Sequence, residues 1–230
     1  MQRHQLVGGL LAAVVGATAL TGCGLEEELG LDDGATPQSP SAPSGTVGDL
    51  PGLPTPAEAT EQLSALKVAP PGSMAGYSRE EFPHWASQDG CSVRQTVLLR
   101  DGENVEVNDD CQPVAGEWYS AFDGVTLTDA SDIDIDHIVP LANAWRSGAD
   151  SWDRERRREF ANDLENPQLI AVSARSNREK GDQSPDQWEP VEEYWCTYAL
   201  AWTGVKHAYG LSVTEDEHER LGEMIGTCAS

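Results

Sequence analysis

The alternation of apolar and polar residues predicts a strand, a second strand and a helix in the second half of the chain. Residues 133–138 read Ile-Asp-Ile-Asp-His-Ile, an alternation typical of a half-buried strand. Residues 169–172 form a short apolar run, which predicts the second strand. Ser173 is a suitable N-cap for a short helix that runs through Lys180 and ends at Gly181.

Helical periodicity dominates the rest of the folded part. A short helix is expected over residues 57–67 and a polar one over residues 152–164. A long amphipathic helix is expected beyond Pro190, and a last helix over residues 214–225. The apolar positions of the long helix are Val191, Trp195, Tyr198, Trp202, Val205 and Tyr209. Together these elements predict an α+β domain.

A disulfide-braced β-hairpin is expected between residues 91 and 111. Residues 91–99 alternate, residues 100–102 read Arg-Asp-Gly as a turn, and the alternation resumes at residues 105–107. In this register Cys91 faces Cys111, which leaves Cys196 and Cys228 to join the two C-terminal helices. A zinc site is the competing use of four cysteines, but no Cys-x-x-Cys pair occurs and the spacings of 20, 85 and 32 do not suit one.

The N-terminal region differs in composition from the rest. Residues 1–22 have a basic start, an apolar stretch and the ending Leu-Thr-Gly before Cys23, which resembles a bacterial lipoprotein signal peptide with a lipidated first mature cysteine. An ordinary secretory peptide is the alternative reading. Residues 23–56 are acidic and rich in Pro, Ser and Gly, which predicts a disordered tether before a domain over residues 57–230. Export places the domain outside the cytoplasm, where disulfides form.

The overall charge of the chain disfavours a nucleic-acid partner. The chain has 15 Lys and Arg against 39 Asp and Glu, for a net charge of −24. Residues 136–180, however, hold eight acidic and eight basic residues, so this window is neutral and contains over half of the positive charge. Acid is thus concentrated in the tether and the scaffold, and weak, metal-dependent binding of a polyanion is the expectation.

One segment carries a recognisable combination of motifs. Its parts are Asp136-His137-Ile138-Val139-Pro140, then Asn166, then Asn177-Arg178-Glu179-Lys180-Gly181. The combination resembles the ββα-metal core of HNH endonucleases, including the HNH domain of RNA-guided CRISPR nucleases. A longer set of motifs is similar to the secreted actinobacterial branch of this family, which is related to the C-terminal domain of GmrSD. The set comprises residues 136–149, Phe160-Ala161-Asn162-Asp163, and Asn177-x-x-Lys-Gly-Asp with Trp188-x-Pro190.

That resemblance implies roles for individual residues. His137 would be the general base that activates the attacking water, a task suited to imidazole. Asp136 and Asn177 would hold one divalent metal, most simply Mg²⁺, with Mn²⁺ or Zn²⁺ as alternatives. Asn166 belongs to the catalytic motif, where it fastens the loop that carries the histidine. Strict alternation points Asp136 and His137 to opposite faces, so the strand must end or bend there.

Other residues have weaker indications. By the same resemblance Lys180 and Arg178 are expected to contact substrate phosphate. The run Asp132-x-Asp134-x-Asp136 could be a calcium loop, but the sixth and twelfth positions do not match an EF-hand. The arginines of residues 154–158 could either grip a sugar-phosphate backbone or form i,i+4 pairs on a solvated helix. For three tryptophans near the motif, the preferred interpretation is packing in the core; they are Trp145, Trp152 and Trp188.

The function expected from the sequence is an extracytoplasmic, lipid-anchored, metal-dependent endonuclease. Its substrate would be DNA, with RNA as a second option, without sequence specificity, and no protein partner is indicated. For His137 the alternative is a core histidine satisfied by a backbone group. The alternative function is a catalytically inactive surface lipoprotein that binds a cation or ligand on the same scaffold.

Overall fold

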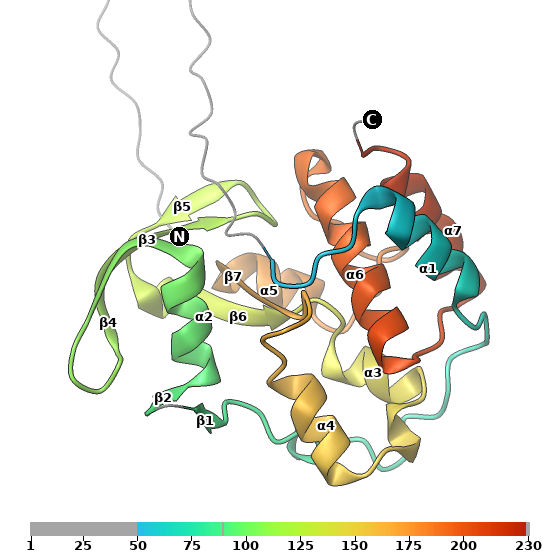
Figure 1. Ribbon diagram of the computed structural model, residues 1–230, viewed down its shortest axis with the longest axis horizontal. Coiled ribbons are helices and arrows are strands. Elements are labelled where there is room, and N and C mark those ends of the chain that lie inside the picture. The colour runs from blue at the N-terminus through green and yellow to red at the C-terminus, as the bar shows by residue number, and fades with distance from the viewer. Residues whose placement is uncertain (1–49, 89, 229–230) are drawn as a thin grey trace, which may run out of the picture. The chain divides into compact units, whose positions relative to one another are not determined.

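The computed structural model describes residues 50–88 and 90–228 (Figure 1). The α+β prediction is confirmed, since helices and small antiparallel sheets make up the described part. The helices are α1 (Pro56–Ala65), α2 (Val93–Asp101), α3 (Leu141–Arg146), α4 (Arg154–Ala161), α5 (Ala174–Lys180), α6 (Trp195–Tyr209) and α7 (Glu215–Ile225). Short 3₁₀ turns are η1 (Arg79–Glu81), η2 (Ala130–Asp132), η3 (Ala149–Ser151) and η4 (Glu192–Tyr194).

The strands form three antiparallel sheets in the described part. They are β1 (Ser87–Gln88), β2 (Cys91–Ser92), β3 (Gly102–Val107), β4 (Pro113–Ser120), β5 (Val125–Leu127), β6 (Ile133–His137) and β7 (Leu169–Ser173). β1 pairs with β2, β3–β4–β5 form a three-stranded sheet, and β6 pairs with β7. The two strands and the helix predicted at residues 133–180 therefore exist as β6, β7 and α5.

The β6–β7 pair lies between two apolar clusters, so both faces of this small sheet are covered. Leu169 and Ala171 pack with α2 and Trp118, whereas Ile170 and Val172 pack in the larger cluster around α6. In Figure 1, α1, α6 and α7 lie side by side, and α2 with the β3–β4–β5 sheet lies across β6–β7 from them. Burial on both faces explains why β7 reads as a continuous apolar run.

Local capping explains where the helices around the site begin and end. The Ser173 hydroxyl accepts the Ser176 N–H at 3.0 Å and starts α5 directly after β7. Gly181 ends α5 with φ +54°, a conformation that glycine adopts readily. Thr214 forms a capping box with Glu217 and starts α7. The predicted N-cap at Ser173 and stop at Gly181 are both confirmed.

Both predicted disulfides are present, but the predicted hairpin is wrong. Cys91 bonds Cys111 and Cys196 bonds Cys228, with Cα–Cα distances of 5.7 and 5.0 Å. Residues 93–101 form helix α2 rather than a strand, and β3 pairs with β4 instead. The first disulfide thus joins β2, directly before α2, to the β3–β4 turn.

The cause of this error is a capping box after Cys91. Gln95 N–H donates to the Ser92 hydroxyl, and the Ser92 N–H donates back to Gln95 Oε1 at 2.7 Å. Val93, Val97 and Leu98 then face the core at helical spacing. Valines at positions 93 and 97 fit both the two-residue period of a strand and the 3.6-residue period of a helix. The capping box decides in favour of the helix.

The folded domain begins before the expected boundary at residue 57. Leu50 is buried in the larger cluster, and Leu53 packs against it. Thr55 caps α1 in a capping box with Glu58. The signal peptide, Cys23 and the tether up to residue 49 lie outside the described residues. Within the described range, no helix combines the length and apolar character needed to cross a membrane.

Candidate active site

The last two residues of β6, Asp136 and His137, contact different elements but border the same cavity. β6 and β7 pair up to the end of β6, with Asp136 opposite Ile170 and His137 opposite Leu169. Both residues belong to the regular ladder, so the expected end or bend of the strand between Asp136 and His137 is not found, and their side chains leave opposite faces of β6. Both residues line a cavity of about 230 Å³ at this end of the strand, and Asn177 lines it as well. The structure therefore brings the three central residues of the motif together.

Asp136 forms a buried ion pair with Lys180, the last residue of α5. Lys180 Nζ lies 3.0 and 2.8 Å from the two carboxylate oxygens and donates a third hydrogen bond of 2.9 Å to the carbonyl of His137. The side chain of Asp136 is 5% exposed and that of Lys180 is 0% exposed. Burial raises the pKa of Asp136, and the ammonium of Lys180 opposes that rise. The ion pair fixes the end of β6 to the end of α5.

His137 is held as a neutral imidazole with one nitrogen available. Its Nε2 lies 2.9 Å from the carbonyl oxygen of Ala161. A carbonyl only accepts hydrogen bonds, so Nε2 carries the proton and Nδ1 carries the lone pair. Burial lowers the pKa of His137 to about 3. No hydrogen-bond partner of Nδ1 occurs among the described residues, so this nitrogen can accept a proton.

Trp85 packs on the imidazole from a segment far away in the sequence. The two ring centroids are 5.6 Å apart with planes inclined by 30°. Trp85 has φ +58°, a left-handed conformation that is rare for a bulky side chain. Backbone strain of this kind persists where the surroundings over-determine the position. Trp85 and Ala161 together fix the orientation of His137.

Asn177 is oriented by the acidic residue that precedes Asp136 on its face of β6. Its Nδ2 donates to Asp134 Oδ2 at 3.0 Å. The amide oxygen is therefore free to face the cavity that Asn177 lines. Asp134 is thus a half-buried residue that holds the Asn177 amide in place.

The cavity also contains a basic side chain to which the sequence analysis gave no role. Arg79, on η1, is exposed and lines the cavity together with Tyr77. Its positive charge contributes to lowering the pKa values of both Asp136 and His137. The only sequence signal was the Tyr77-x-Arg79 pair upstream of the motif.

Gln168 performs the fastening expected of Asn166. The backbone N–H and the Nδ2 of Asn166 donate to the two carboxylate oxygens of Asp163, which closes a turn between α4 and β7. Gln168 is fully buried: its carbonyl accepts the Ile138 N–H at 2.7 Å, and its side chain bonds both backbone groups of Val139. Gln168 therefore holds the segment that follows His137, and the sequence analysis missed it because a lone Gln has no distinctive spacing.

The position of Lys180 does not fit the expected phosphate contact. Its side chain is buried, and all three N–H groups are used by Asp136 and the His137 carbonyl. Arg178, two residues earlier on α5, is exposed and remains accessible. The sequence could not separate these two residues, because burial of Lys180 depends on packing against α6 and neighbouring loops.

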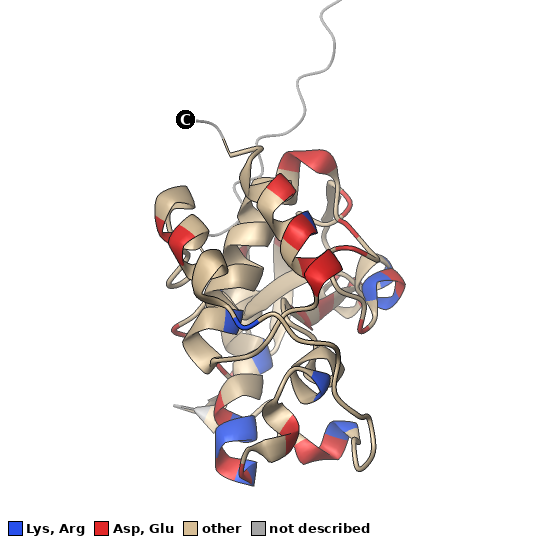
Figure 2. Ribbon diagram, turned by 90° about the vertical axis from the view of Figure 1, so that its right-hand side faces the viewer, with Lys and Arg blue, Asp and Glu red and all other residues tan. Residues whose placement is uncertain are grey.

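The arginine-rich helix α4 has a largely structural set of contacts. Arg157 is buried, donates to the Trp152 carbonyl at 2.6 Å and pairs with Glu81 at 3.0 Å. Arg158 pairs with Glu155, an ordinary contact along an exposed helix. Trp145, Trp152 and Trp188 all pack in or against the larger cluster, as expected. Figure 2 shows mixed charges on α4 at one end and acidic residues gathered on α7.

Comparison with known proteins identifies the family. Residues 97–224 match the family described as GmrSD restriction endonucleases, C-terminal domain. The chain belongs to this family. A secreted protein of uncharacterised function from Arthroderma benhamiae is 52% identical over 180 residues, which cover 77% of this chain and 88% of the relative. No solved structure matches the chain.

Membership of this family agrees with the position of the candidate site in the chain. The family is nuclease-related, and the matched region contains β6, β7 and α5. The disulfides and the secreted relative agree with an extracytoplasmic location. In the described residues no group of three or more His, Cys, Asp and Glu is placed to hold a metal ion.

Proposed function

We propose that the protein is a metal-dependent endonuclease of the HNH type that hydrolyses phosphodiester bonds of DNA, and of RNA as a second substrate. The observation that carries this proposal is the neutral, oriented imidazole of His137 on a cavity shared with Asp136 and Asn177. β6, β7 and α5 supply the strand–strand–helix order of a ββα-metal core. Family membership supports nuclease chemistry in general.

His137 acts as the general base through Nδ1. The hydrogen bond from Nε2 to Ala161 fixes the tautomer and leaves the Nδ1 lone pair for a water proton. After proton transfer, the positive imidazolium is stabilised by the same carbonyl, which now accepts a stronger hydrogen bond. Burial lowers the pKa of His137, which keeps its imidazole unprotonated at neutral pH before the reaction.

The oxygen donors suit a hard cation that keeps most of its water. Both carboxylate oxygens of Asp136 accept hydrogen bonds from Lys180. Two carboxylate oxygens offer about four acceptor positions, so some remain for a cation. Asn177 offers its amide oxygen, since its Nδ2 is held by Asp134. Mg²⁺ commonly binds through one or two protein oxygens plus substrate phosphate, so two donors are sufficient. When bound, such an ion supplies stabilisation of the charge that develops on the leaving oxygen.

Arg79 and Arg178 bind the substrate phosphates in this proposal, and Lys180 positions Asp136. Arg79 lines the cavity and is exposed, so its guanidinium can form a bidentate contact with phosphate. Lys180 keeps the Asp136 carboxylate in one orientation through two short contacts. These phosphate contacts are weak and independent of base sequence, because few cations face the substrate on a chain of net charge −24.

The proposed location is the outer face of a cell membrane, through a lipid on Cys23, or the secreted space. Cys23 lies outside the described residues, and the disulfides support an oxidising location alone.

One observation favours a second function, an inactive scaffold that binds a cation or ligand. Lys180 neutralises Asp136 and takes part of its coordination capacity. If the ion pair blocks the site, the protein binds nucleic acid or cations without cleavage.

Plasmid nicking tests the proposal. The intact chain, with disulfides formed, is incubated with supercoiled plasmid and Mg²⁺ or EDTA. We expect nicking that EDTA abolishes, and a loss of about 10²–10⁴-fold in His137→Gln, whose amide can still donate to the Ala161 carbonyl. His207→Ala, an exposed histidine on α6, is the matched control and should keep full activity.

Two results would reject the assignment. Equal nicking by wild type and His137→Gln would exclude His137 as the base. Absence of nicking with any divalent metal, together with measurable metal binding by calorimetry, would instead identify the inactive scaffold.

A further inference from the structure

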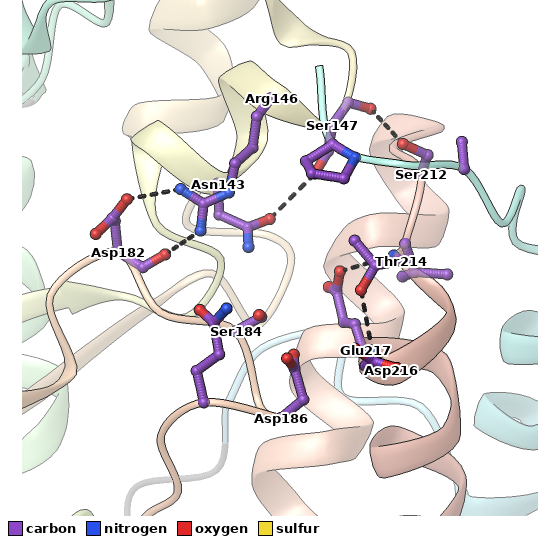
Figure 3. A pocket seen from close by; sticks show the side chains of 14 residues that line it. Asn143, Arg146, Ser147, Asp182, Ser184, Asp186, Ser212, Thr214, Asp216 and Glu217 are labelled. Carbon is purple, nitrogen blue, oxygen red and sulfur yellow. Dashed lines mark hydrogen bonds and ion pairs between the residues drawn. The ribbon is translucent and has the colours of Figure 1, made fainter. Parts of the chain in front are cut away.

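A second, larger cavity adjoins the proposed active site. It has a volume of about 480 Å³, within the range of small-molecule sites, and lies between α3, the 182–187 segment and the start of α7 (Figure 3). Asp182 lines both this cavity and that of His137. We call this second space the α3–α7 cavity.

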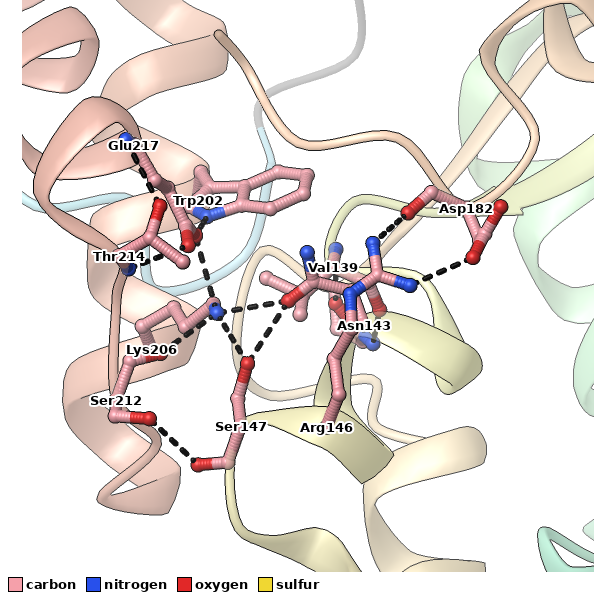
Figure 4. Close-up of polar contacts among 11 residues, drawn as sticks. Val139, Asn143, Arg146, Ser147, Asp182, Trp202, Lys206, Ser212, Thr214 and Glu217 are labelled. Carbon is pink, nitrogen blue, oxygen red and sulfur yellow. Dashed lines mark hydrogen bonds and ion pairs between the residues drawn. The ribbon is translucent and has the colours of Figure 1, made fainter. Parts of the chain in front are cut away.

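A buried amide projects its donor group into the α3–α7 cavity. Asn143 is only 2% exposed. Its Oδ1 accepts hydrogen bonds from Lys206 Nζ at 2.8 Å and Ser147 Oγ at 3.1 Å (Figure 4). Because an ammonium only donates, this contact fixes which amide atom is oxygen. Nδ2 is left on the cavity side, without a hydrogen-bond partner among the described residues (Figure 3).

A buried network of hydrogen bonds and one ion pair lies behind Asn143. Lys206 is buried and also pairs with Glu217 at 3.0 Å. Glu217 accepts the Trp202 indole N–H at 2.6 Å and caps α7 through its other oxygen. These contacts hold Lys206 and Glu217 behind Asn143 and so orient its amide.

Acceptor groups stand at the opposite side and rim. Asp186 and Asp216 line the cavity and are exposed. Within the described part of the chain, neither carboxylate lies within ion-pair distance of a basic side chain. The other cavity acids are engaged, Asp182 by Arg146 and Glu217 by Lys206. The cavity thus offers one buried N–H donor group and two free carboxylates.

The remaining wall is apolar and fixed in place. Pro71 and Val213 line it. The 67–72 segment is held by backbone hydrogen bonds from Ala69 to Val213 and from Gly72 to Arg146. A flat ligand can therefore lie against an apolar wall while its edge reaches polar groups.

We propose that the α3–α7 cavity binds an unpaired or extruded base of the nucleic-acid substrate, with a preference for guanine; this rests on the proposed nuclease function. The Watson–Crick edge of guanine presents a carbonyl beside two N–H donors, which matches the amide of Asn143 and the free carboxylates. Adenine, cytosine and uracil offer fewer adjacent donors. A base carries no charge, so it enters an acidic cavity that would repel phosphate, and the phosphates stay near Arg79 outside.

Nucleoside titration followed by protein NMR tests the proposal. The intact chain in EDTA is titrated with guanosine, adenosine, cytidine and uridine, so that the result is independent of metal and cleavage. We expect guanosine to shift the signals of cavity residues and to bind at least about fivefold more tightly than the others. Asp186→Ala should weaken guanosine at least about fivefold. Glu215→Ala, an exposed acid at the start of α7 that does not line the cavity, should bind guanosine like wild type.

The outcomes separate this proposal from the proposed function. The guanine site is overturned if the four nucleosides bind with equal affinity, if guanosine does not bind, or if guanosine shifts only signals of residues outside the cavity. Each of these results counts against the site even when the protein nicks plasmid. If spermidine shifts the signals of the cavity residues and guanosine does not, the cavity is a site for organic cations instead. Guanosine binding in a protein that does not nick overturns the nuclease proposal and keeps the base site. Asn143 is left unchanged because its substitution would also remove a hydrogen-bond acceptor of the buried Lys206.

Discussion

Replacing Lys180 by Met should destabilise the domain through an uncompensated buried charge. Methionine keeps an unbranched side chain of similar length, so the main change is loss of the ammonium that contacts both oxygens of Asp136. Removing one partner of a buried ion pair costs about 3–5 kcal/mol. In a domain of this size each kcal/mol lowers the melting temperature by about 2–4 °C, so a decrease of about 6–20 °C is expected.

Urea unfolding in EDTA, with both disulfides intact, measures this cost. The variant Asp136→Leu/Lys180→Met removes both charges and serves as the matched comparison. Replacing a buried pair by apolar residues is often neutral or stabilising by about 1–4 kcal/mol. The double variant should therefore be at least as stable as wild type within about 1 kcal/mol, although it lacks the same lysine as the single variant.

Two results would refute this reasoning. A loss below about 1 kcal/mol in Lys180→Met would show that Asp136 is solvated or protonated without its partner. Equal destabilisation of the single and double variants would show that the lysine stem and its hydrogen bond to the His137 carbonyl matter more than the charge.

Further predictions concern alkali, a disulfide and the imidazole. Burial raises the pKa values of Tyr194, Tyr198 and Tyr209. The neutral forms of these tyrosines therefore stabilise the fold fully at pH values below the unfolded-state pKa of about 10. Stability should fall as the pH rises above this value. Tyrosinate absorbance should then appear in the same pH range as the loss of circular dichroism. Replacing Cys196 and Cys228 by Ser should cost about 2–5 kcal/mol in urea unfolding. Trp85→Ala should lower kcat for nicking more than it changes KM, since it frees the ring of His137; an unchanged kcat would contradict this.

The central strand–strand–helix unit was predictable because strong local signals agree there. The alternation at residues 133–138, the apolar run at 169–172 and the cap at Ser173 each specify an element independently. Helix α2 was missed because valines at positions 93 and 97 fit both a strand and a helix. The Ser92–Gln95 capping box decides in favour of the helix, and its Ser-x-x-Gln pattern is visible in the sequence.

The candidate site could be predicted only in part, since its partners come from distant segments. Asp136, His137 and Asn177 were selected by motif and do line one cavity. The groups that orient His137 are the carbonyl of Ala161 and the ring of Trp85, and neither position is set by spacing to the motif. Burial of a lysine is equally a property of the assembled core, because charged side chains are rarely inside unless paired.

The two buried lysines have related positions, which gives them a common explanation. Lys180 lies behind the His137 cavity and Lys206 behind the α3–α7 cavity, and each pairs with one carboxylate. A buried ion pair is a weak source of net stability, so stability alone does not account for either. Each lysine instead fixes a polar group at a cavity wall: the carboxylate of Asp136 in one case, the amide of Asn143 in the other. The apolar Asp136→Leu/Lys180→Met variant should therefore fold as well as wild type and fail to nick plasmid, which separates the contribution of the pair to chemistry from its contribution to folding.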